Sequence, residues 1–323
     1  TFANSFFGIT YFIVLQADQK LWVSSLLQSI CYVLNTFLTV LLILIGCKIH
    51  MVKLGSTVIY LIYPLVLSWY VKRKYKIDKK AIPNNKAISQ RWDAFWHQVS
   101  VFVMDNTDVM VLTAFTNMLE VSVYSVYNLV TNGLKRAISC FSNGIEAAFG
   151  NMIAKKEISL LKENVSLMEL ILYSISTITH TSAILLVLQF VGIYTKGISD
   201  VNYIRPIFAY ILLIAQFFNS VRIPYQLVVQ AAGHYKQTKK GAIIEPIINI
   251  SASIALVVHF GLVGVAIGTL IATIFRTVQF SLYMSKNILY RSSIIALLKC
   301  TVSLGEGLIT ILVVKSLSLH EPT

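Results

Sequence analysis

Charge is scarce in this sequence. Of its 323 residues 13% are charged and 56% are hydrophobic, and the mean hydropathy is +0.71. A soluble domain carries about 25% charged residues because its surface faces water. The composition therefore excludes an ordinary soluble domain and predicts an integral membrane protein.

Catalytic and metal-binding motifs are also missing. The four cysteines stand singly in apolar segments, and none has a second cysteine or a histidine at ligand spacing. This excludes a recognisable metal site or disulfide framework. The sequence contains no P-loop, no GxSxG and no HExxH. We therefore predict no catalytic residue, no metal and no cofactor, and without an ATP site we expect secondary transport or facilitated passage.

Acidic residues are few, and the formal net charge is +13. The basic residues lie in short segments between apolar runs rather than along one face, which indicates membrane topology and not nucleic-acid binding. One set of alternate loops holds seventeen Lys and Arg residues and the other set holds five. Because cytoplasmic loops carry the excess, both Thr1 and the end of the last helix are predicted to lie outside.

Apolar runs of spanning length predict an all-α, polytopic protein of about ten transmembrane helices. These are expected at about 2–16, 23–46, 54–71, 92–115, 120–149, 165–195, 203–231, 241–260, 262–285 and 294–316. The segment 72–91 carries eight positive charges and is predicted to be a cytoplasmic linker. The chain begins in an apolar stretch without Met and shows no signal peptide, so we expect an upstream portion to be missing.

Ionisable side chains at membrane depth are costly and usually face a bundle interior or a water-filled cavity. Asp105 and Asp108 are three residues apart and therefore share one helical face. They are candidates to bind a coupling ion, either a proton or Na⁺. The structural alternative is pairing with an arginine of a neighbouring helix.

Basic residues at membrane depth are candidates to bind an anion such as a phosphate. Lys135 and Arg136 lie midway through one span, where the alternatives are snorkelling or pairing with Glu146. Arg222 stands two residues before Pro224, at an expected kink, and Arg276 lies in a later span.

Arg222 or Arg276 could instead neutralise Asp105, Asp108 or Glu245. For Glu245, which precedes Pro246, we expect a structural role.

Two stretches carry a family resemblance. QRWDAFWHQVSVFVMDNTDVMVLTAFTNMLEVSVYSVYNLV at 90–130 and FGNMIAKKE at 149–157 resemble bacterial polysaccharide biosynthesis proteins. These are lipid-linked oligosaccharide flippases of the multidrug/oligosaccharidyl-lipid/polysaccharide exporter superfamily. LQADQK at 15–20 and YVKRKYKID at 70–78 are similar to connectors of the same family. The likeness is firmest over residues 70–157.

The resemblance implies a fold of two six-helix bundles followed by two further helices. Residues 1–71 would then be the last three helices of the N-terminal bundle, 72–91 the basic linker and 92–285 the C-terminal bundle. Residues 286–323 would hold one additional helix, with the last one absent.

The resemblance also implies a function. Such a protein would flip undecaprenyl-diphosphate-linked oligosaccharide across the bacterial cytoplasmic membrane for O-antigen or capsule synthesis, with H⁺ or Na⁺ coupling and glycan-assembly proteins as partners. One alternative is a multidrug/cation antiporter of the same superfamily, which would favour buried carboxylates. Another is an integral-membrane polysaccharide polymerase or acyltransferase, which should show a large outer loop.

Overall fold

The computed structural model describes residues 9–75, 89–142, 144–292 and 294–318, and every regular element among them is a helix. The predicted all-α class is confirmed. Residues 2–8 of the first expected helix, and residues 76–88 of the expected linker, lie outside the described residues.

The chain divides into two compact units, one formed by residues 1–84 with 143–148 and the other by 85–142 with 149–323. The first unit contains α1 (Ile9–Ala17), α2 (Leu21–Leu44) and α3 (Ile49–Lys74), and α2 packs along α3. Apolar side chains such as Leu15 and Leu67 form its core, where the Ser24 and Tyr63 hydroxyls are 2.6 Å apart.

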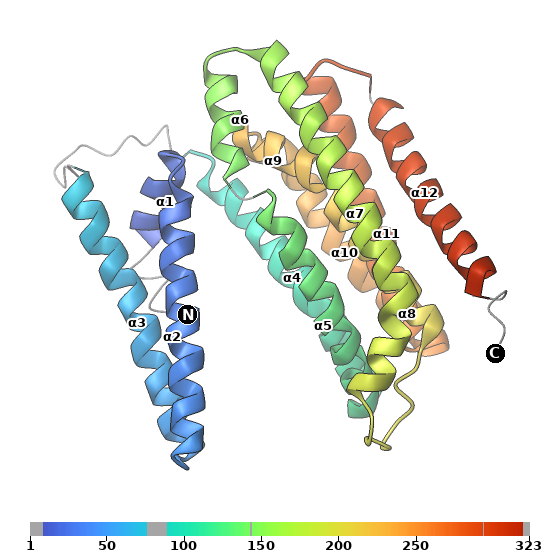
Figure 1. The fold of residues 1–323 in the computed structure, drawn as a ribbon. Coiled ribbons are helices and arrows are strands. Elements are labelled where there is room, and N and C mark those ends of the chain that lie inside the picture. Colours follow the sequence, from blue (N-terminus) through green and yellow to red (C-terminus); the bar gives the residue numbers. More distant parts are fainter. Residues whose placement is uncertain (1–8, 76–88, 143, 293, 319–323) are drawn as a thin grey trace. The chain divides into compact units, whose positions relative to one another are not determined.

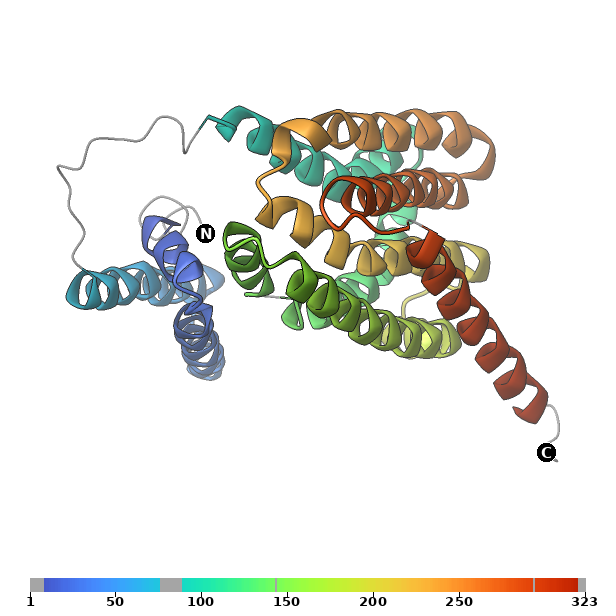
Figure 2. The ribbon, with the colours of Figure 1, turned by 90° about the horizontal axis from the view of Figure 1, so that it is seen from above.

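The second unit is a helical bundle, drawn from teal to red in Figure 1 and seen from above in Figure 2. In chain order its helices are α4 (Arg91–Phe115), α5 (Met118–Cys140), α7 (Ile158–Tyr194), α8 (Pro206–Val221), α9 (Ile223–Ala231), α10 (Tyr235–Phe260), α11 (Leu262–Asn287) and α12 (Ile294–Ser318). Between α5 and α7 lies α6 (Ile145–Ala154), which contains the unit boundary. Helix α10 packs against α4 and α11, α11 against α8, and α7 against α8 and α12.

Six helical segments among the described residues are long and apolar enough to cross a membrane: α2, α3, α7, α8 together with α9, α10 and α11. The chain is therefore a multi-pass membrane protein. Helices α4 and α5 are of similar length, at 25 and 23 residues. They carry charged and amide residues that lower their hydropathy, and several of these residues recur below in the wall of a cavity.

Two of the expected helices are interrupted, each with a local cause, whereas α10 continues through Pro246. The helix expected over 120–149 ends at Cys140, and Gly144 in the following turn has φ +88°, a conformation that side chains with a Cβ rarely adopt. The span 203–231 is divided at Arg222 into α8 and α9. Pro224 has no N–H to continue the ladder, and its ring crowds the preceding turn. The predicted kink at Arg222 is confirmed.

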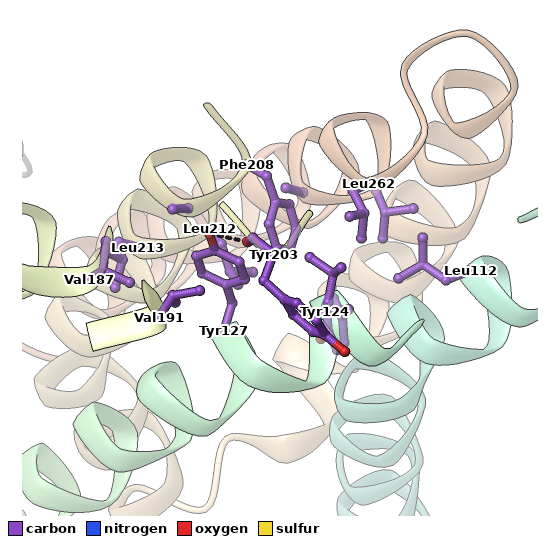
Figure 3. Packing of buried hydrophobic residues seen from close by; sticks show 14 of the residues in the cluster. Leu112, Tyr124, Tyr127, Val187, Val191, Tyr203, Phe208, Leu212, Leu213 and Leu262 are labelled. Carbon is purple, nitrogen blue, oxygen red and sulfur yellow. Dashed lines mark hydrogen bonds between the residues drawn. The ribbon is translucent and has the colours of Figure 1, made fainter. Parts of the chain in front are cut away.

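The apolar core of the second unit fixes α5 against α7 and α8 (Figure 3). Tyr127 and Phe208 pack edge to face with ring centroids 5.2 Å apart. The Tyr127 hydroxyl donates to the carbonyl of Tyr203 at 2.9 Å and accepts the Arg205 backbone N–H at 2.9 Å. Because this buried hydroxyl both donates and accepts a hydrogen bond, it holds the α7–α8 connection onto α5.

Candidate functional site

A cavity of about 470 Å³ lies within the second unit, walled by α4, α5, α8, α9, α10 and α11. Its volume falls within the range of roughly 300–1,000 Å³ typical of small-molecule sites. The polar residues of its wall are Asp105, Asp108, Tyr124, Asn128, Thr131, Asn132, Lys135, Ser139, Ser142, Gln216, Asn219, Ser220, Arg222, Gln226, Glu245 and Thr269.

The polar wall follows from helical periodicity. On α5 the lining residues Tyr124, Asn128, Thr131, Lys135 and Ser139 recur at intervals of three or four positions, so they form one stripe along the helix. A polar stripe of this kind at membrane depth faces protein or water rather than lipid.

Asp105 and Lys135 form an ion pair across α4 and α5. The Lys135 ammonium donates to Asp105 Oδ1 at 2.8 Å, and both side chains are about half exposed, at 49% and 53%. Lys135 therefore has a partner in Asp105, whereas the alternatives to anion binding considered from the sequence were snorkelling and pairing with Glu146. Both charges remain accessible from the cavity.

Asp108 is buried one helical turn further along α4, with 4% of its surface exposed. It accepts hydrogen bonds from Thr269 Oγ1 at 2.8 Å and from the Tyr124 hydroxyl at 3.1 Å. Within the described residues its donors are neutral, and no cation lies within ion-pair distance. A carboxylate without a fixed counter-ion is suited to bind a mobile one.

A chain of oxygen atoms continues behind Asp108. Asn249 Oδ1 lies 3.3 Å from Thr269 Oγ1 and accepts from Ser253 Oγ at 3.0 Å. Ser253 Oγ is also 3.4 Å from the carbonyl of Val265. Each hydroxyl has one proton to donate, so this part of α10 and α11 is rich in acceptors.

Arg222 reaches the cavity from the break between α8 and α9. Its Nη1 donates to Glu245 Oε1 at 2.6 Å, and both residues line the cavity. Arg222 Nε is buried and has no hydrogen-bond partner within the described residues.

Arg276 lies behind Glu245 and is 3% exposed. Its Nε is 3.3 Å from Glu245 Oε2, and its Nη2 donates to His97 Nδ1 at 3.2 Å. Since a guanidinium can only donate, His97 must accept at Nδ1, while its Nε2 faces the carbonyl of Tyr235 at 3.1 Å. With these two contacts His97 is neutral and carries its proton on Nε2.

Four of the six predicted site residues meet at the cavity wall: Asp105, Asp108, Lys135 and Arg222. The remaining two do not. Arg136 is exposed and lies outside the lining, whereas Arg276 is buried and neutralises Glu245, the structural alternative considered for it.

Sequence reasoning missed other parts of the site. Glu245 was assigned a structural role, yet it lines the cavity and holds Arg222. The five amides of the wall are Asn128, Asn132, Gln216, Asn219 and Gln226. A search for charged residues alone does not reveal a polar stripe of amides. The regular spacing of these amides along α5 and along α8 and α9 could have indicated it.

Comparisons with protein-family models, curated proteins and solved structures found no match for the chain. A functional assignment therefore depends on the cavity, together with the sequence resemblance described above.

Proposed function

We propose that this chain belongs to a secondary transporter that flips undecaprenyl-diphosphate-linked oligosaccharide across the bacterial cytoplasmic membrane, in a fold of two helical bundles with about ten spans in this chain. The observation that carries the proposal is a cavity inside a membrane-embedded helical unit whose wall combines two cations with five amides. Few membrane-spanning helices carry so many polar side chains without a polar cargo.

The cations suit the diphosphate. Lys135 on α5 and Arg222 at the α8–α9 break both line the cavity, and an ammonium and a guanidinium are common partners of phosphate oxygens. Arg136 and Arg276 do not line the cavity, so Lys135 and Arg222 carry the proposal.

The amides suit the glycan. Amide side chains present both donors and acceptors, as sugar hydroxyls do, so they can bind many orientations of a polyol. The lipid tail would stay in the bilayer, where it needs no polar partner.

Asp108 is the residue that we propose to bind the coupling ion. It is buried at the cavity wall with two neutral donors and lies beside the acceptors of Asn249 and Ser253. Binding of H⁺ or Na⁺ would neutralise a carboxylate that has no counter-ion among the described residues, which links the ion to the state of the cavity.

Flipping in proteoliposomes tests the proposal. The protein would be reconstituted and supplied with a fluorescent diphosphate-linked oligosaccharide lipid, and the wild type compared with Arg222→Ala and Lys135→Ala. Arg205→Ala is the matched control, because Arg205 pairs with Glu120 at 3.1 Å outside the cavity lining. We expect flipping by the wild type and the control and loss of flipping in the cavity variants. Absence of flipping under any ion gradient would refute the proposal.

A cation antiporter is the second candidate, and one observation favours it. The cavity wall contains three carboxylates, Asp105, Asp108 and Glu245, against two cations. The same vesicles would therefore be tested with a lipophilic dye cation. Uptake of the dye that depends on Asp108, without flipping of the lipid, would favour the antiporter.

A further inference from the structure

The two oxygens of Glu245 are divided between two arginines. Oε1 lies 2.6 Å from Arg222 Nη1, and Oε2 lies 3.3 Å from Arg276 Nε. Glu245 as a residue is 5% exposed, so water does little to stabilise its charge. One buried anion thus has two cations, one on each side.

The two arginines are held very differently. Arg276 donates to the carbonyl of Thr238 at 3.3 Å, to His97 and to Gln279, and it lies 4.0 Å from the ring centroid of Phe280. These contacts fix its position.

Arg222 lines the cavity, and its Nε has no partner within the described residues. Its ion pair with Glu245 is the side-chain interaction that the structure shows for it. Arg222 therefore has unused donors and fewer anchoring contacts than Arg276.

We propose that Glu245 is an internal counter-anion that occupies Arg222 while the cavity is empty and is displaced by the phosphate oxygens of the cargo, with Arg276 as the cation that retains it. This inference rests on the proposed function. A buried carboxylate left without a cation is strongly unfavourable. Because Arg276 is already in contact with Oε2, Glu245 keeps a partner when Arg222 leaves it.

The arrangement also sets specificity. A ligand must compete with a carboxylate that is already 2.6 Å from Arg222. A diphosphate has more charge and more acceptor oxygens than a carboxylate and can bind a guanidinium through two of its nitrogens. A singly charged ligand would not displace Glu245, so the cavity would select a diphosphate over a monoanion.

The Lys135 pair needs no such device. Lys135 and Asp105 are about half exposed, so water can stabilise each of them when the pair opens. Its separation is therefore less costly than that of the buried pair.

A binding cycle tests the inference. Binding of undecaprenyl diphosphate to the detergent-solubilised protein would be measured for the wild type, Arg276→Gln and the double variant Glu245→Gln, Arg276→Gln. The double variant removes one negative and one positive charge and leaves Arg222 without its carboxylate partner. Glu245→Gln alone would instead leave two arginines uncompensated. Arg205→Gln is the control, and undecaprenol and inorganic pyrophosphate show whether the lipid or the phosphate is recognised.

The expected changes have opposite signs. Arg276→Gln leaves Glu245 with Arg222 alone, so undecaprenyl diphosphate should bind about tenfold more weakly than to the wild type. The double variant should bind about tenfold more tightly than the wild type, because Arg222 no longer has a competitor. Equal affinity of the wild type and the double variant would overturn the inference.

A second measurement needs no ligand. The rate at which phenylglyoxal modifies Arg222 would be followed by mass spectrometry in the same variants, with Arg205 in each sample as the internal reference. Modification of Arg222 should be faster in the double variant and slower in Arg276→Gln. An unchanged rate would overturn the inference even if the lipid binds. If the modification rates change as predicted but no variant binds undecaprenyl diphosphate, the proposed cargo is refuted instead.

Discussion

Two buried carboxylates of the second unit have the same charge balance and different surroundings. Glu245 contacts Arg222 and Arg276 and lines the cavity. Glu169 on α7 contacts Arg291 and Lys299, is fully buried and does not line the cavity. The comparison teaches that a buried ion cluster is not by itself a binding site. An accessible cavity beside the cluster separates a role in binding from a role in packing.

The surroundings of Glu169 indicate packing. Lys299 donates to Glu169 Oε2 at 2.6 Å from α12, and Arg291, in the turn between α11 and α12, donates to both oxygens. Glu169 therefore ties the last helix to α7, against which α12 packs (Figure 1).

The largest expected effect is the loss of stability in Glu169→Gln. Removing one partner from a buried ion cluster costs about 3–5 kcal/mol, and here two cations would lose their carboxylate. Thermal unfolding in detergent should show a markedly lower midpoint, while the protein that remains folded binds undecaprenyl diphosphate as before. The control is Glu120→Gln, whose pair with Arg205 is partly exposed. A midpoint equal to that of the control would show that α12 does not depend on Glu169.

The second expected effect concerns Asp108, which differs from both glutamates because its donors are the neutral side chains of Thr269 and Tyr124. In Asp108→Asn the charge is removed and the size is kept. If Asp108 binds the coupling ion, the apparent affinity for H⁺ or Na⁺ should fall about ten- to a hundredfold. The measurement is flipping against a series of ion gradients. An unchanged ion dependence, with Glu120→Gln outside the cavity lining as the control, would assign coupling elsewhere.

A smaller effect separates the two neighbours Lys135 and Arg136. Lys135 lines the cavity and Arg136 does not, although they are adjacent in the sequence. Because the Lys135 pair is half exposed, Lys135→Gln should weaken binding of undecaprenyl diphosphate by up to about fivefold. Arg136→Gln should leave the affinity unchanged. Equal losses in both variants would mean that the cargo reaches beyond the cavity.

The sequence predicted the helices better than the site. Apolar runs placed most helices to within a few residues, and Pro224 marked the break at Arg222. Membrane depth also identified Asp105 and Lys135 as candidates. Partner choice was not predictable, since it depends on which faces of different helices meet. Adjacent residues on one helix point in different directions, so Lys135 and Arg136 could not be separated from sequence alone.

The smallest effect on stability is expected for Asp18, whose ion pair is exposed, in contrast to the buried clusters around Glu245 and Glu169. In the first unit Asp18 accepts from Lys20 and from the Tyr75 hydroxyl, in the turns outside α1, α2 and α3. The hydrogen bond from Lys20 lowers the pKa of Asp18, so its contribution to stability should be complete above its ordinary value of 3.8 and should disappear as the pH falls below that. Unfolding midpoints of wild type and Asp18→Asn should therefore differ slightly at pH 7 and low salt, and should converge once the pH has fallen through the lowered pKa of Asp18 or in high salt, since exposed ion pairs contribute little and are screened. A difference as large as that of Glu169→Gln would contradict the view that burial, rather than the number of partners, determines how much each carboxylate contributes.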